Sequence, residues 1–145
     1  MNYNDVYYVA ALIEYVSRKT KNRRRYVVKK IGMEGIRHLL EDANANHCLS
    51  IGQVSEEVVE DYGIEMGEFD SVGKCQYKVP GYLPIGKNYA RLVEDVESNP
   101  ERYPEALYEV LCSPISDAMS DFNSSFFYAG REEIAYAYQN AKEGA

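Results

Sequence analysis

Apolar residues recur every three or four positions along most of the chain, which is the spacing of one face of an α-helix. The first stripe covers residues 4–19, where Asn4 can act as N-cap and Asp5 suits the positive end of the helix dipole. Later stripes of the same period predict further helices at about residues 26–31, 34–45, 55–62, 85–96, 104–111, 115–122 and 131–142. The pattern predicts an all-α, compact multi-helix fold.

Glycine, serine and proline mark the ends of these predicted helices. Gly32 and Gly63 are placed to end helices, because glycine tolerates the left-handed conformation that often follows the last helical turn. Ser50 or Ser55 can cap the helix that Gly63 ends. Proline at the first helical position is favoured, so Pro104 and Pro114 indicate two further starts.

Residues 64–84 break the helical period and are rich in glycine and proline. Within them Cys75, Tyr77 and Val79 alternate with polar residues, which is a strand signal. We therefore expect a small irregular or β-hairpin insert near residues 68–82. The stretch 64–84 then acts as a connector inside the fold.

The length of 145 residues suits a single domain, residues 1–145, with 46% hydrophobic and 27% charged residues. The connector separates a four-helix part, residues 1–63, from a helical part, residues 85–145. No charged-then-apolar leader and no apolar run near 20 residues is present, so no membrane association is expected. The three cysteines form no CxxC pair, which favours reduced thiols in a cytoplasm.

Charge divides between the two ends of the chain. Residues 1–40 carry nine Lys/Arg against three Asp/Glu, a net +6, and residues 41–145 carry seven against twenty, a net −13. The basic charge is concentrated in eight cations within thirteen residues: Arg18, Lys19, Lys21, Arg23, Arg24, Arg25, Lys29 and Lys30. This segment can bind nucleic acid by neutralising phosphates, or it can dock on the acidic half of the same chain.

The acidic part offers a second candidate surface, this time for a protein partner. Its members are exposed-looking acids on two predicted helices: Glu56, Glu57, Glu60, Asp61, Glu94, Asp95 and Glu97. They form either a solvated face or a phosphate-like surface for a basic partner. Fourteen tyrosines and no tryptophan also suit interfaces, although most of the tyrosines fall on inward stripes and are explained first by core packing.

No arrangement of residues points to catalysis, a cofactor or a metal. His38 and Glu41 have the spacing of two ligands on one helix, but no third ligand is marked. Cys48 follows His47 directly, and a buried structural thiol explains it better than a nucleophile. Residues 81–87 match the start of a phosphate-binding loop, yet Asn88 replaces the required Ser/Thr. We therefore expect a non-enzyme without cofactor.

Residues 5–62 resemble short, uncharacterised bacterial helical proteins that are encoded beside toxin genes. The residues behind this are Ile13-Glu14-Tyr15, Ile36, Leu39-Leu40-Glu41 and His47. The chain departs from that pattern at residues 44–46, which are less apolar, and in the basic run at residues 23–25. The resemblance implies an antitoxin-like or accessory protein of a toxin–antitoxin locus, with a helical fold.

Together these observations predict a non-catalytic regulatory protein that acts by binding a protein partner of unknown identity. The alternative is a nucleic-acid-binding regulator that uses the basic segment 18–30. The sequence leaves homo-oligomerisation open.

Overall fold

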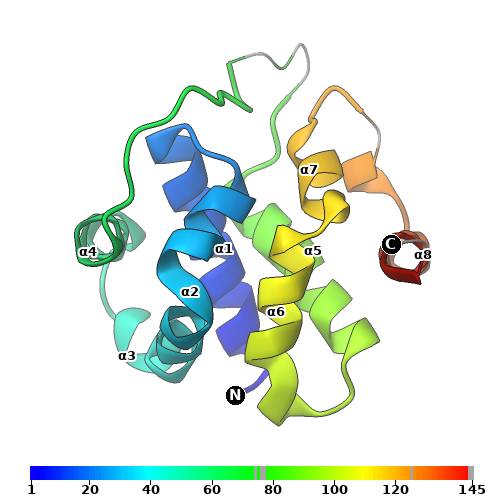
Figure 1. Ribbon diagram of the computed structural model, residues 1–145, viewed down its shortest axis with the longest axis horizontal. Coiled ribbons are helices and arrows are strands. Elements are labelled where there is room, and N and C mark those ends of the chain that lie inside the picture. Colours follow the sequence, from blue (N-terminus) through cyan, green and yellow to red (C-terminus); the bar gives the residue numbers. More distant parts are fainter. Residues whose placement is uncertain (74, 76–77, 125, 144–145) are drawn as a thin grey trace.

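A computed structural model describes residues 1–73, 75, 78–124 and 126–143, and every regular element in these residues is a helix (Figure 1). The α-helices are α1 (Tyr3–Thr20), α2 (Arg24–Glu41), α3 (Ala43–Asn46), α4 (Ile51–Tyr62), α5 (Tyr82–Val96), α6 (Tyr103–Cys112), α7 (Pro114–Ser120) and α8 (Arg131–Glu143). Two short 3₁₀ turns add η1 (Pro100–Arg102) and η2 (Phe126–Tyr128). The predicted all-α class is confirmed.

The central element is α1, which lies between the other helices in Figure 1 and is buried along most of its length. It packs mainly against α5, and Gly86 allows the close approach. A Cβ atom at residue 86 would lie 2.8 Å from the Cβ atom of Ala11. One apolar core therefore joins helices from both ends of the chain, with Val9, Tyr89 and Leu107 each wholly buried.

The outer helices complete this arrangement around α1 and α5. Helix α2 packs on α1 and α6, whereas α4 packs chiefly on α1 and stands at one edge of the molecule (Figure 1). Helix α8 lies at the opposite edge, against α5 and α7. Across the described ranges, no helix combines the length and the apolar character needed to cross a bilayer.

The expected β-hairpin near residues 68–82 is wrong for the described residues there, and Tyr77 lies outside them. Residues 64–73 instead run along the end of α1. The backbone N–H groups of Gly67 and Phe69 donate to the carbonyl oxygens of Thr20 and Lys21, at 2.8 and 2.9 Å. The last carbonyls of a helix have no partner inside it, so they compete with strand pairing for these donors.

The helix ends largely follow the predicted signals. Ser50, rather than Ser55, caps α4 and accepts a hydrogen bond from the backbone N–H of Gln53 at 3.2 Å. The prediction that Asn4 caps α1 is wrong, because Asn2 takes that role in a reciprocal pair with Asp5.

Glycine conformation explains two of the breaks. Gly32 has φ 77° and ψ 167°, so α2 consists of two helical pieces joined at a kink, in agreement with the predicted break. Gly63 has φ 61° and ends α4. A β-carbon would be strained at either backbone angle, and glycine avoids that cost.

Candidate interaction surfaces

The basic segment surrounds a buried arginine at the start of α2. The Arg24 side chain is 1% exposed, and its guanidinium donates to the Glu14 carboxylate at 2.6 Å. It also donates to three further oxygens: Tyr89 Oη at 3.0 Å, the Ser116 carbonyl at 2.9 Å and Ser120 Oγ at 2.6 Å. Arg24 therefore ties α1, α2, α5 and α7 together and presents no surface to a phosphate.

Neighbouring groups explain why the buried Arg24 guanidinium stays charged. Burial by itself lowers the pKa of Arg24, but its neighbours Glu14, Tyr89 and Asp117 together outweigh this effect, Glu14 most strongly, so the pKa is raised. For Tyr89 burial has the opposite effect and raises the pKa, and the positive charge of Arg24 partly opposes that rise. The corner thus stays ionised because the cation and the carboxylate are buried together.

The other three arginines of the segment also contact the rest of the chain. Arg18 donates to the Pro80 carbonyl at 2.6 Å and lies over the Phe122 ring. Arg23 and Arg25 both pair with the Asp117 carboxylate on α7. Burial is the main influence on Arg18 and lowers its pKa. These contacts are of the kind expected if the basic segment docks on the second half.

The four lysines of the segment lie outside this junction, and all of them are exposed. Lys19 lies 3.8 Å from Glu56, and Lys30 lies over the Tyr26 ring. Lys21 adopts the left-handed conformation that ends α1. Lys21 and Lys29 make no salt bridge with a described residue. The segment predicted for nucleic acid therefore divides into arginines in internal contacts and lysines on the outside.

The seven predicted partner-binding acids also divide into two groups. Four of them lie on the outward face of α4: Glu56, Glu57, Glu60 and Asp61. We call these four residues the α4 acidic face. The Glu56 side chain is 76% exposed, and Lys19 is its only ion-pair partner among the described residues. Glu57, Glu60 and Asp61 form no salt bridge within that same part of the chain.

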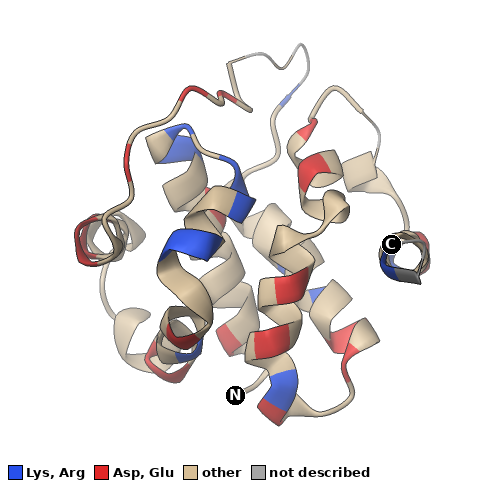
Figure 2. Cartoon of the chain, in the orientation of Figure 1, with Lys and Arg blue, Asp and Glu red and all other residues tan. Residues whose placement is uncertain are grey.

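The negative field of this face extends to neighbouring tyrosines. The pKa of Tyr8 is raised by burial and then by the charge of Glu57. The pKa of Tyr62 is raised by burial, with Asp61 and Asp42 adding to it. Figure 2 shows that acidic residues continue beyond α4 along the segment that leaves it, where Glu65 and Glu68 are exposed.

The remaining three acids, at the end of α5, are held by arginines of the same chain. Arg131 at the start of α8 donates to Glu94 at 2.6 Å and to Asp95 at 2.7 Å. These two hydrogen bonds raise the pKa of Arg131, the one that Asp95 accepts having the larger effect and the one that Glu94 accepts the second. Arg102 lies 3.3 Å from Glu97. Each of the three acids at this end of α5 therefore already has an arginine partner inside the molecule.

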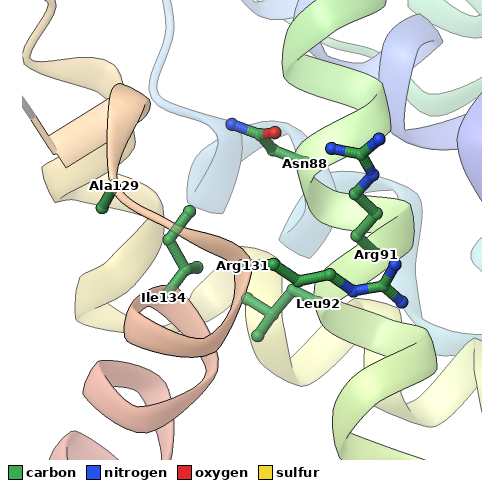
Figure 3. A pocket seen from close by; sticks show the side chains of 6 residues that line it. All are labelled: Asn88, Arg91, Leu92, Ala129, Arg131 and Ile134. Atoms are coloured by element: carbon green, nitrogen blue, oxygen red, sulfur yellow. The ribbon is translucent and has the colours of Figure 1, made fainter.

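A small hollow lies beside Arg131, between α5 and α8 (Figure 3). Its volume is about 40 Å³, with Asn88 and Arg91 contributed by α5 and Ile134 by α8. Asn88 donates to the Phe127 carbonyl at 3.2 Å, which uses this side chain to hold the turn before α8. The hollow has room for little more than one or two water molecules, so it is too small for a substrate.

The residues considered for catalysis lie on different elements, with His38 on α2 and His47 at the end of α3, directly before Cys48. His38 Nδ1 lies 3.7 Å from Glu41, but no group of three metal-ligating side chains occurs in the described part of the chain. Cys48 was expected to be buried and is exposed. The phosphate-loop-like stretch instead forms the first turns of α5, with Gly86 pressed against Ala11.

The sequence analysis did not point to Asp117 and Arg131, the residues that pair with several of the predicted binding residues inside the molecule. Asp117 and Arg131 each serve two partners, yet both are distant in sequence from them and carry no local motif. Comparisons with protein-family models, with curated proteins and with solved structures find no match to this chain.

Proposed function

We propose that the protein is a non-catalytic regulator that binds a basic partner protein through the α4 acidic face. The observation that carries the proposal is the position of these acids on their helix. Glu60 and Asp61 lie in the last turn of α4, where the helix dipole is negative and no basic residue is present. Acids at that end are unfavourable, so a cationic partner would relieve a cost that the free protein bears.

Repulsion within α4 adds to this cost. Glu56 and Glu60 are four residues apart, as are Glu57 and Asp61, so like charges are neighbours on the helix surface. Each such pair destabilises a helix by about 0.2–0.5 kcal/mol. The inward face of α4 packs through Val54 and Val58, so the acids themselves contribute nothing to that contact.

The kind of regulator follows from the resemblance of residues 5–62 to antitoxin-like and accessory proteins. A protein of that class neutralises a partner by covering its surface, and an acidic helix suits a partner that itself binds nucleic acid. The α4 acidic face lies within this resembling stretch. The proposed partner is therefore a basic protein, such as the toxin of a toxin–antitoxin locus.

Direct binding of nucleic acid is the second candidate, and its surface would be the exposed lysines Lys19, Lys21, Lys29 and Lys30. The arginine contacts argue against it, because Arg24 is buried and both Arg23 and Arg25 pair with Asp117. Acidic residues also stand close by, with Glu56 near Lys19. Such neighbours repel phosphates and reduce the electrostatic gain.

The test uses a fluorescein-labelled decalysine peptide as the basic probe and a 20-bp DNA duplex as the competing one. Fluorescence anisotropy at low salt measures the Kd of each. We expect the peptide to bind and the double variant E57Q/E60Q to weaken it about tenfold, as the loss of two exposed ion pairs would do. The matched control is E132Q/E133Q, which removes the same charge from the exposed first turn of α8.

Two results would overturn the proposal. Equal weakening by E57Q/E60Q and E132Q/E133Q would show that only net charge matters. Tighter binding of the duplex than of the peptide, lost on replacing Lys29 and Lys30 by glutamine, would establish the nucleic-acid alternative instead.

A further inference from the structure

A polar pocket lies where the connector, the start of α2 and the end of α7 meet, on one side of the molecule (Figure 1). Its volume is about 340 Å³, which falls within the range of small-molecule sites. Its lining includes the cation Arg23, the acids Asp70, Asp117 and Asp121, and the rings of Phe69 and Phe122. The pocket therefore offers both signs of charge beside an aromatic surface.

The walls of this pocket are held in place from two sides. On the α7 side Phe122 is 6% exposed, and Ser120 accepts a hydrogen bond from the buried Arg24 at 2.6 Å. On the connector side the Asp70 carboxylate accepts the backbone N–H group of Gly73 at 2.7 Å, which fixes the local turn. The shape of the pocket is thus set before a ligand arrives, and this lowers the ordering cost of binding.

Arg23 supplies the positive charge of the pocket, and most of its donors are unused. Its Cζ atom lies 4.1 Å from the centre of the Phe69 ring, which positions the guanidinium at the pocket wall. Its one hydrogen bond to a described residue is 3.4 Å long and goes to Asp117, which also pairs with Arg25. An arginine can donate two parallel hydrogen bonds to a single carboxylate. Arg23 therefore keeps donors for the carboxylate of a ligand.

Asp121 supplies the available negative charge. It directly follows α7, is exposed and accepts the backbone N–H group of Asn123 at 3.1 Å. Across the described ranges it forms no salt bridge, whereas Asp117 in the same pocket is held by two arginines. A carboxylate accepts several hydrogen bonds, so Asp121 keeps acceptor sites for an ammonium group.

We propose that this pocket binds a free aromatic amino acid. Its carboxylate binds Arg23, its ammonium group binds Asp121, and its ring packs on the phenylalanines of the lining. A simple anion would meet three carboxylates and leave Asp121 unmatched, and a simple amine would meet the Arg23 guanidinium. A zwitterion matches both charges, and aromatic rings prefer one another in offset or edge-to-face contact.

The pocket shares no residue with the α4 acidic face, and its occupation does not depend on that face. Loss of decalysine binding and loss of amino-acid binding are therefore independent results. The pocket adds recognition of a small molecule to the proposed recognition of a basic protein.

The experiment uses L-phenylalanine as the probe and two truncated compounds as its counterparts. Phenethylamine lacks the carboxylate, and 3-phenylpropanoate lacks the ammonium group. Chemical-shift titration of the ¹⁵N-labelled full chain gives each Kd and shows which backbone amides respond. We expect L-phenylalanine to bind about three- to tenfold more tightly than either truncated compound, because each of them loses one exposed ion pair. The shifts should be concentrated in residues 69–73 and 117–123.

Two variants identify the charged groups responsible. R23Q should weaken L-phenylalanine and 3-phenylpropanoate by about the same three- to tenfold and should not weaken phenethylamine. D121N should weaken L-phenylalanine and phenethylamine and should not weaken 3-phenylpropanoate. Both side chains are exposed, so near-native thermal transitions are expected.

Each variant has a matched control elsewhere on the surface. K21Q removes an exposed cation two residues from Arg23 that does not line the pocket. D42N makes the same change as D121N at the other end of α2. Neither control should change the Kd of L-phenylalanine.

Three results would overturn the proposal. Absence of saturable L-phenylalanine binding up to its solubility limit would remove the site. Binding that either truncated compound equals, or that R23Q and D121N weaken no more than their controls do, would remove the recognition of a zwitterion. Shifts concentrated outside residues 69–73 and 117–123 would place the ligand elsewhere.

Discussion

The C-terminal ends of α4 and α5 carry similar acids in similar positions, and the rest of the chain treats them differently. At α5, Arg131 holds Glu94 and Asp95, with both contacts under 3 Å. At α4, Glu60 and Asp61 have no salt bridge among the described residues. The two helix ends have the same unfavourable dipole, but only one is compensated from within the molecule.

The difference shows that the charge of a segment does not by itself define an interaction surface. Compensation at α5 depends on α8, which follows 35 residues later in the chain and brings Arg131 to the acids. In the described part of the chain no cation forms a salt bridge with Glu60 or Asp61 at the end of α4, which stands at the edge of the molecule (Figure 2). Availability of a charge therefore depends on which elements the fold brings beside it.

Among the replacements considered, we expect that of the buried Arg24 to change the free energy of unfolding most. R24M should lower the free energy of unfolding by about 3–5 kcal/mol, because the buried Glu14 carboxylate loses its closest cation and keeps only Arg18, whose Nε atom lies 3.4 Å away. Urea denaturation followed by circular dichroism measures the change. K30M is the control in the same segment, and we expect it to cost less than about 0.5 kcal/mol.

If R24M does not fold, the double variant E14L/R24M still tests the same point. Removing both charges should recover much of the stability, since paired apolar replacements of a buried ion pair are often neutral. A stable R24M, or a double variant no better than the single one, would contradict the role assigned to this pair.

Replacing Arg131 should change the free energy of unfolding by an intermediate amount. R131M should lower the free energy of unfolding by about 1 kcal/mol, as expected for a partly exposed cation with two carboxylate partners. It should also create a second free acidic helix end, so that decalysine gains affinity. R91M is the control, because Arg91 is nearby on α5 but pairs with no acid in the described ranges. Unchanged peptide affinity in R131M would break the parallel between the two helix ends.

Local signals in the sequence predicted much of the fold. Apolar stripes placed most of the long helices, and Gly32, Gly63 and Pro114 marked breaks that the structure contains. The segment after α4 was predicted less well. The alternation of Cys75, Tyr77 and Val79 indicated strands, but the described residues Cys75 and Val79 lie in no strand. Earlier in the segment, the N–H groups of Gly67 and Phe69 bind carbonyl oxygens at the end of α1, which is a long-range contact without a local pattern.

The candidate surfaces were predictable only as lists of charges. The sequence left open whether the basic segment meets nucleic acid or the acidic half, and it grouped the acids of α4 with those of α5. Choosing between such alternatives requires the positions of Asp117 and Arg131, which only tertiary packing provides. The burial of Arg24 could not be predicted from the sequence either, because Arg23 and Arg25 on either side of it are also arginines. Only the fold gives the three side chains different surroundings.

Asp61 gives the smallest effect and the sharpest test of the comparison, because stability and binding should change in opposite directions. D61K places a cation at the negative end of α4 and should raise the free energy of unfolding by about 0.3–1 kcal/mol. The same change should weaken decalysine binding. E65K is the matched control: it makes the same charge reversal just beyond the helix, so it should weaken the peptide without stabilising the fold. A less stable D61K would mean that these acids support α4, and the α4 acidic face would then need no partner to explain it.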